Sequence, residues 1–166
     1  MSFLDSIDDD PKRANRRPLL FFVLVTSAVG AAASVFTEPN IAGWYAGLVQ
    51  PSFAPPNWVF APVWTTLYVL MAVAAWRVWR VAGTKSLEIF AYFLQLIFNF
   101  AWSAIFFAAH QIGLALLELC VLLALILATT ILFWRRDRLA GWLFLPYLAW
   151  TSFATALNYA FWSLNR

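Results

Sequence analysis

Amide and aromatic side chains recur at helical spacing in the middle of the chain, and their types suit ligand binding better than acid–base chemistry. The first such stripe comprises Gln95, Asn99, Trp102 and Phe106. Their intervals of i, i+4, i+7 and i+11 place all four on one face of a helix. An amide in hydrocarbon costs free energy unless it has a hydrogen-bond partner, so we expect this face to point into a helix bundle.

Two further stripes carry the same kinds of side chain. The one after Pro62 comprises Trp64, Tyr68 and Met71, and the one after Pro146 comprises Tyr147, Trp150, Thr151, Ala154 and Asn158. Two interpretations are open: interhelical packing and hydrogen bonding, or a pocket for a flat, largely apolar ligand that amides and hydroxyls orient. The mid-span tryptophans favour the pocket, because neither an interfacial belt nor small-residue helix contacts account for them.

Few other side chains offer chemistry. The single histidine, His110, lies in a tight connection, where a helix-end residue is favoured over a haem ligand. Glu118 is the only ionisable group well inside a long apolar run, and it is either a functional group or a side chain that reaches back to the interface. Cys120 stands alone, and the sequence has no metal-ligand cluster or glycine-rich phosphate loop.

The segment WYAGLVQPSFAPPNWVF, residues 44–60, lies between two long apolar runs and carries no charge. Its prolines and glycines forbid a regular helix through most of it, yet it is rich in Trp, Tyr and Phe. The predicted connection, Thr37 to Trp58, exceeds the roughly 12 to 15 residues above which such loops are usually functional. We expect a lid over the open end of the bundle, with a segment lying in the lipid headgroups as the alternative.

Composition identifies the elements that must position these residues. The 166 residues are 63% hydrophobic and 11% charged, less than half the roughly 25% typical of soluble domains. Five apolar runs are long enough to cross a membrane as helices, and none alternates like a barrel strand. They cover residues 19–36, 58–80, 87–109, 112–134 and 139–164. The predicted fold is an all-α integral membrane protein, a five-transmembrane-helix bundle with a long aromatic loop between helices 1 and 2.

The charges predict the topology. We expect a disordered cytoplasmic tail over residues 1–18 and a single membrane domain over residues 19–166. All of the eleven Lys and Arg except Arg166 fall on the side of the N-terminus, which the positive-inside rule makes cytoplasmic. Cleavage after Ala31–Ala33 as a signal peptide is an alternative that leaves this orientation unchanged. The formal charge of +3 is thus a topology signal, and no nucleic-acid partner is expected.

Three motifs carry a resemblance to a known family. They are WYxxLxxPxFxPPxWVFxPVWTxLYxLM from Trp44, QLxFNxxW from Gln95 with FF following, and LFxPYLxWxxxATxLN from Leu143. In this order, and over residues 20–162, the chain resembles the translocator protein family, also called tryptophan-rich sensory proteins or TspO/MBR. The resemblance implies a five-helix, often dimeric bundle that binds porphyrins, haem-related tetrapyrroles and, in some members, cholesterol, in a pocket closed by the first loop.

The resemblance also implies roles for single residues. Trp64 and Trp150 match tryptophans implicated in porphyrin binding and light-dependent porphyrin breakdown, and they are the only catalytic candidates. Tyr45 and Pro51 match the lid motif, while Ala154 matches a small pocket position on the fifth helix. With the stripes, the expected ligand-binding residues are Tyr45, Pro51, Trp64, Tyr68, Gln95, Asn99, Trp102, Phe106, Tyr147, Trp150 and Ala154. No metal is expected, and the porphyrin is a ligand and not a fixed cofactor.

The resemblance also bears on the oligomeric state and on cholesterol as a further ligand. Family dimers pack through the third helix, where Ala104 and Ala108 form a small-xxx-small pair; Gly30 and Ser34 form another on the first helix. A homodimer is therefore expected. The cholesterol motif is broken, because Arg166 lies one residue too far from Tyr159, so cholesterol is not a favoured ligand.

Three functions are carried forward from the sequence. The favoured one is a membrane receptor or sensor for tetrapyrroles. One other is a light- and oxygen-dependent porphyrin-degrading enzyme, which would use a tryptophan radical in place of the acid–base pair that the spans lack. The third is a transporter of porphyrin or lipid-like ligands, for which the chain lacks charged relays and inverted repeats. The charge bias favours a bacterial cytoplasmic membrane, with another envelope or organellar membrane as the alternative.

Overall fold

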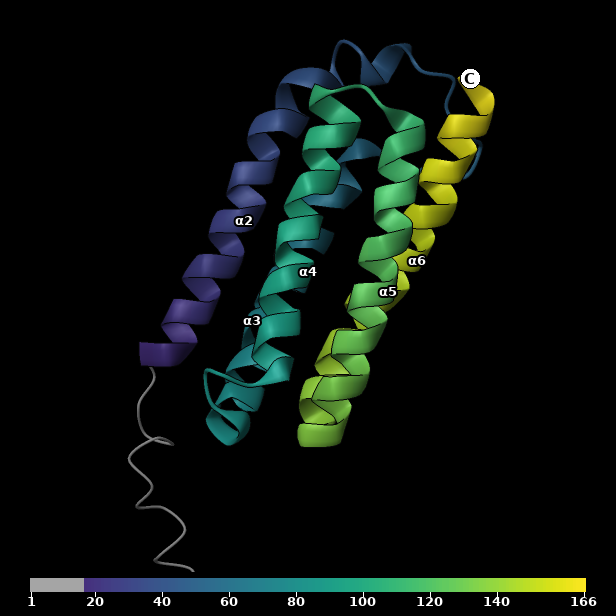
Figure 1. The fold of residues 1–166 in the computed structure, drawn as a ribbon. Helices are drawn as coiled ribbons and strands as arrows, with labels where there is room; N and C mark the ends of the chain where they lie inside the picture. Colours follow the sequence, from purple (N-terminus) through teal and green to yellow (C-terminus); the bar gives the residue numbers. More distant parts are fainter. Residues whose placement is uncertain (1–16) are drawn as a thin grey trace, which may run out of the picture.

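The computed structural model describes residues 17–166, and regular structure in this range is helical throughout (Figure 1). The five long helices are α2 (Arg17–Ile41), α3 (Phe60–Ala82), α4 (Leu87–Ser103), α5 (Ile112–Arg136) and α6 (Arg138–Leu164). Contacts between the helices run in the order α2, α3, α6, α5, α4 and back to α2, so the bundle closes on itself. The predicted tail over residues 1–18 falls almost wholly outside the described residues.

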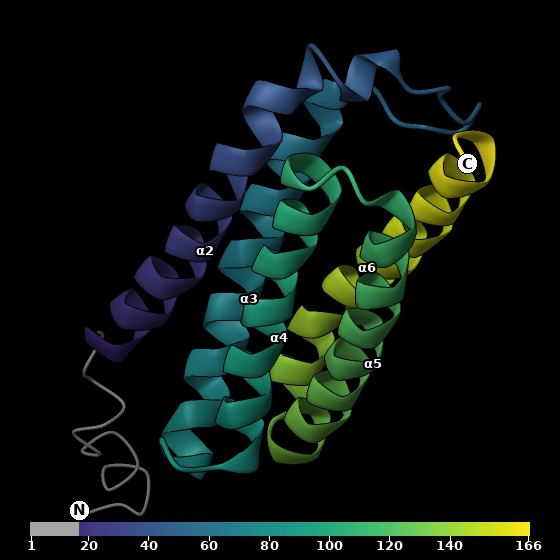
Figure 2. The same cartoon turned by 45° about the horizontal axis from the view of Figure 1, so that its top comes forward.

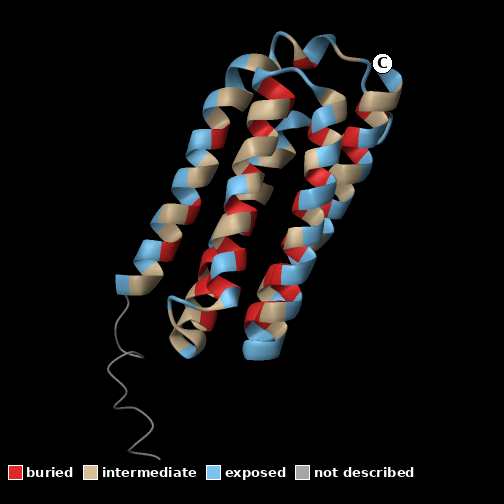
Figure 3. Cartoon of the chain, viewed as in Figure 1, coloured by how far each residue is buried: buried red, intermediate tan, exposed pale blue. Residues whose placement is uncertain are grey.

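Within residues 17–166, four helices are long and apolar enough to cross a membrane. They are Arg17–Ile41, Asn57–Ala82, Leu87–Ala108 and Ile112–Arg136. Helix α6 has 27 residues and is not among these four, so its crossing stays a prediction. Large apolar side chains such as Leu24, Ile97 and Leu117 point away from the bundle, and the buried residues face inward (Figure 3). This distribution fits helices whose outer surfaces meet hydrocarbon.

The first helix is longer than the sequence predicted. It continues to Ile41, because the Thr37 hydroxyl donates to the Ala33 carbonyl and the Asn40 amide donates to the Phe36 carbonyl at 2.8 Å. Pro39 is accommodated in this last turn, where it interrupts few backbone hydrogen bonds. The connection to α3 is correspondingly shorter than the predicted Thr37 to Trp58 segment, and it contains two 3-10 turns, η1 (Tyr45–Gly47) and η2 (Asn57–Val59).

The third span, which contains α4, ends in a wider turn than the predicted regular helix. Residues Ala104–Ala108 form the π-helical turn η3, in which the Ala109 N–H donates to the Ala104 carbonyl at 2.9 Å. His110 then takes a left-handed backbone with φ of 56°, which turns the chain into α5. The extra residue in the turn brings Phe106 and Phe107 together into the buried cluster at this end of the bundle.

Ion pairs hold the opposite end of the bundle. The Arg77 guanidinium of α3 lies 2.8 Å from the carboxylate of Asp137, the residue between α5 and α6. Arg136 of α5 pairs with Glu88 in the first turn of α4. The connection between α2 and α3 lies at the other end, beside the C-terminus (Figure 2). The two ends therefore differ in chemistry: one is charged and ion-paired, the other largely aromatic.

Candidate functional site

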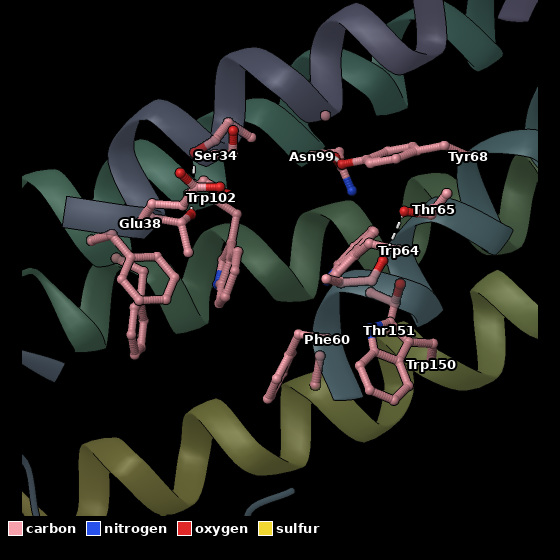
Figure 4. A pocket seen from close by; sticks show the side chains of 18 of the residues that line it. Ser34, Glu38, Phe60, Trp64, Thr65, Tyr68, Asn99, Trp102, Trp150 and Thr151 are labelled. Atoms are coloured by element: carbon pink, nitrogen blue, oxygen red, sulfur yellow. Dashed lines mark hydrogen bonds between the residues drawn. The ribbon is translucent and has the colours of Figure 1, made fainter. Parts of the chain in front are cut away.

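A cavity of about 490 Å³ lies inside the bundle, between its middle and the end that carries the connection (Figure 4). All five long helices contribute to its wall, together with Phe106 and Phe107 of η3 and Tyr45 of η1. The volume falls in the range of small-molecule sites, which is roughly 300 to 1,000 Å³. The wall is mostly aromatic and aliphatic, with a few amides and hydroxyls.

The polar groups at the inner end of the cavity form one hydrogen-bonded chain. The Tyr68 hydroxyl donates to Asn99 Oδ1 at 2.9 Å, and Asn99 Nδ2 donates to the Tyr147 hydroxyl at 3.0 Å. The Tyr147 hydroxyl donates in turn to Gln95 Oε1 at 3.0 Å, and Gln95 Nε2 donates to the Tyr92 carbonyl. These bonds fix Asn99 and leave it one N–H for a ligand, since a side-chain amide has two donor hydrogens.

A second chain fixes the indole of Trp102. Its Nε1–H donates to Asn158 Oδ1 at 3.0 Å, and Asn158 Nδ2 donates to the Ile112 carbonyl at the start of α5. The Trp102 ring stacks on Phe106 with centroids 5.2 Å apart. The hydrogen bonds and the stacking leave Trp102 as a rigid apolar wall between α4 and α6.

Several polar side chains in the cavity wall have donor hydrogens with no partner within residues 17–166. The indole N–H groups of Trp64 and Trp150 make no hydrogen bond there, although both rings pack against other aromatic residues. The Thr151 hydroxyl is also unpartnered, and Thr151 is only 1% exposed. A buried hydroxyl without a partner costs about 1–3 kcal/mol, so this part of the wall favours a ligand or water that can pair with it.

The connection covers the end of the cavity. Tyr45 is 8% exposed, and its ring packs on Phe106, Phe107 and Phe161. Burial raises the pKa of Tyr45. Trp44 stacks on His110 with centroids 4.3 Å apart, and the Val49 backbone exchanges two hydrogen bonds with the Asn165 side chain. The connection is thus attached to η3, to His110 that follows it, and to the end of α6.

The structure brings most of the predicted site residues to the cavity wall. Those that line it are Tyr45, Trp64, Tyr68, Asn99, Trp102, Phe106, Trp150 and Ala154. Gln95 and Tyr147 lie one layer behind and hold Asn99, while Pro51 is buried in the connection and does not line the cavity. Binding of a ligand at these residues stays a prediction.

Sequence reasoning missed one wall of the cavity, the one formed by α2. Its lining residues include Ser27, Ala31, Ser34 and Glu38. Their intervals of i, i+4, i+7 and i+11 repeat those of the first aromatic stripe, and this was the signal available in the sequence. It went unnoticed because small side chains in an apolar run resemble ordinary helix packing. Thr151 was recognised in its stripe but not included among the ligand-binding residues.

The remaining candidates lie outside the cavity wall or pack within the chain. Gly30 lines the cavity and faces Tyr68, whose ring leaves no room for a side chain, so packing of α2 on α3 explains this glycine. Ala104 and Ala108 lie in η3, and a dimer through them stays a prediction. Both carboxyl oxygens of Glu118 are buried without a partner among residues 17–166, and Glu118 does not line the cavity. His110 belongs to the covered end, where it contacts Trp44 and Asn40.

Comparison with known proteins agrees with this architecture. The sequence matches the TspO/MBR family over residues 22–163. It is 40% identical to the human translocator protein over 153 residues, which cover 90% of each chain. It is 38% identical to protein CrtK of Rhodobacter capsulatus over 88% of this chain and 91% of the relative. It is 36% identical to the tryptophan-rich protein TspO of Archaeoglobus fulgidus over 89% of this chain and 96% of the relative. The chain is therefore a membrane protein that belongs to the TspO/MBR family.

Proposed function

We propose that this protein is a membrane receptor for tetrapyrroles, which bind in the cavity between the helices. The observation that carries the proposal is the pairing of two half-buried indoles, Trp64 and Trp150, with unpartnered polar hydrogens in one wall. A flat macrocycle can stack on such rings while its nitrogens and edge substituents pair with the free hydrogens. The connection between α2 and α3, which contains Tyr45, then covers the ligand.

The Asn99 side-chain amide, which is held by hydrogen bonds, orients the bound ligand. Its remaining N–H and the lone pairs of the Tyr68 hydroxyl face the cavity at the end opposite the connection (Figure 4). Because both groups are already held by hydrogen bonds, a ligand that pairs with them loses little free energy to side-chain ordering. Relatives of this chain carry the names tryptophan-rich sensory protein and translocator protein, and these names accord with ligand recognition followed by signalling or transfer.

The proposal includes the setting of the receptor. All five long helices cross a bacterial cytoplasmic membrane, with the N-terminus in the cytoplasm and the connection and C-terminus on the opposite side. The clustering of Arg77, Arg80, Arg135 and Arg138 at the end away from the connection supports this orientation. The receptor acts as a homodimer through η3, where Ala104 and Ala108 allow close approach of a second copy.

Tryptophan-fluorescence titration with protoporphyrin IX, in detergent and in the dark, tests the proposal. We expect saturable quenching whose midpoint rises several-fold in the Trp64→Phe/Trp150→Phe double variant, because stacking on an indole is stronger than on a phenyl ring. Trp142→Phe is the matched control, since Trp142 is 59% exposed on the outer face and packs on Trp134.

Two results would overturn the receptor. One is quenching that never saturates, and the other is a midpoint that is the same in the double variant as in the wild type. Illumination of the complex after binding tests the second predicted function, light- and oxygen-dependent degradation of the porphyrin. Loss of the porphyrin absorption spectrum that requires light, oxygen and Trp150 would favour a degrading enzyme, because Trp150 lines the cavity beside the bound ring.

A further inference from the structure

The end of the cavity nearest the connection carries a carboxylate. Glu38 lies in the last part of α2 and lines the cavity, with its side chain exposed at the opening. It makes no ion pair or hydrogen bond with any residue of 17–166. Figure 4 shows Glu38 with Ser34 and Trp102 at one end of the cavity, and Tyr68 with Asn99 at the other.

No cation offsets this carboxylate in the cavity wall. Among the described residues that line the cavity, none is Lys, Arg or His. The two basic side chains at this end of the described bundle are directed elsewhere. His110 contacts Asn40 and stacks on Trp44, and the Arg166 guanidinium lies 5.4 Å from the ring centroid of Trp162. A ligand at this end therefore meets an unbalanced negative charge.

Aromatic rings surround the same end. Tyr45, Trp102, Phe106 and Phe107 all line the cavity here, and Trp102 and Phe106 present stacked rings. Aromatic faces attract organic cations through their negative quadrupole, and a nearby carboxylate adds to this attraction where water is partly excluded. The combination suits the ammonium group of an amine and opposes a carboxylate.

We infer that Glu38 makes this end of the cavity a subsite for a cationic nitrogen of the ligand. The inference rests on the proposed function, because it concerns the same cavity, and it narrows the ligand class. The site prefers flat aromatic rings whose edge substituents are amine-bearing, accepts neutral ones, and disfavours those that place carboxylates at the opening. A porphyrin with free propionates binds less tightly than the same ring with those groups blocked or replaced by amines.

The test compares three ligands that share one ring: protoporphyrin IX, its dimethyl ester, and its diamide with ethylenediamine, which ends in two amines. Each is titrated against the wild type and Glu38→Gln in a non-ionic detergent at low salt. In the wild type we expect the diamide to bind most tightly and the free acid least. Glu38→Gln should strengthen binding of the acid and weaken binding of the diamide, each by about fivefold, and leave the ester unchanged. Both shifts should shrink in high salt.

The matched control is Glu118→Gln, which makes the same side-chain change at a carboxyl group outside the cavity wall. It should keep the wild-type affinities for the three ligands. The inference is overturned if Glu38→Gln leaves the affinities for the acid and the diamide unchanged, or if Glu118→Gln shifts them equally, while saturable binding keeps the receptor intact. Absence of saturable binding by all three ligands would instead overturn the proposed function itself.

Discussion

At the scale of single residues, the position of Tyr68 depends on a glycine of the neighbouring helix. An added Cβ at Gly30 would lie 2.3 Å from Cε2 of Tyr68, which is closer than non-bonded atoms approach. The same ring carries the hydroxyl that donates to Asn99 at 2.9 Å. The absence of a side chain at Gly30 therefore allows the Tyr68 ring to reach the position in which its hydroxyl bonds to Asn99.

Gly30→Ala should displace the Tyr68 ring and break its hydrogen bond to Asn99. We expect a loss of stability of about 1–3 kcal/mol and weaker porphyrin binding, measured by thermal unfolding and fluorescence titration in detergent. Gly43→Ala is the matched control, because a Cβ at Gly43 meets nothing within 4 Å. Tyr68→Phe should cost little further in the Gly30→Ala background. Equal costs of Tyr68→Phe in both backgrounds would contradict the link.

Residue types at helical spacing predicted much of this site, but only where the side chains are distinctive. Trp64, Asn99 and Trp150 stood out because mid-span indoles and amides need a reason to be there. Ser34 and Glu38 were missed for different physical reasons. Small side chains occur in most packed helices, and Glu38 fell in the segment Thr37 to Trp58 that was predicted as a loop. The Thr151 hydroxyl has no hydrogen-bond partner because of how the helices pack in three dimensions, and the spacing of residues along the sequence does not predict this.

At the scale of elements, Asp137 joins three helices. Its carboxylate accepts hydrogen bonds from the Leu139 and Ala140 N–H groups at the start of α6 and pairs with Arg77 of α3. Burial raises the pKa of Asp137, but the hydrogen bonds from Ala140 and Arg77 outweigh it and hold the pKa below its ordinary value. The ionised form is therefore the one that stabilises the folded bundle.

The lowered pKa of Asp137 determines how the stability of the folded bundle depends on pH. Because the folded pKa lies below the unfolded one, about 3.9, the stabilisation is present above that value and disappears as pH falls through the folded pKa. Asp137→Asn keeps a capping side chain and removes the charge, so it should cost about 1 kcal/mol at pH 7 and progressively less below pH 4. Thermal unfolding at several pH values measures this, and a cost that is constant from pH 7 to pH 3 would contradict it.

The elements were predictable in existence and less so at their ends. Five apolar runs of sufficient length predict five long helices. In hydrocarbon the backbone N–H and C=O groups must form hydrogen bonds within the protein, and a helix forms them within each run. The end of α2 depends on side-chain hydrogen bonds from Thr37 and Asn40, which local propensity does not capture. The π turn at Ala104–Ala108 has no sequence signal of its own, since it follows from how Phe106 and Phe107 pack on other elements.

At the scale of the whole molecule, the chemistry of its two ends predicts how it sits in the membrane. Arginines cluster near Arg77 and Arg135, whereas the connection that contains Ser52 has no charge. The positive-inside rule predicts that the arginine end is cytoplasmic. The cavity then opens near the far side, so a ligand would arrive from outside the cytoplasm or from the bilayer.

Single cysteines in a Cys120→Ala background test this orientation in intact bacterial cells. Ser52→Cys, at an exposed position of the connection, should react with a membrane-impermeant maleimide. Thr84→Cys, exposed between α3 and α4, should react only after the membrane is permeabilised. The opposite pattern would invert the topology and place Glu38 and the cavity opening toward the cytoplasm. Ligand capture would then draw on the cytoplasmic pool, so the labelling result decides which compartment supplies the ligand.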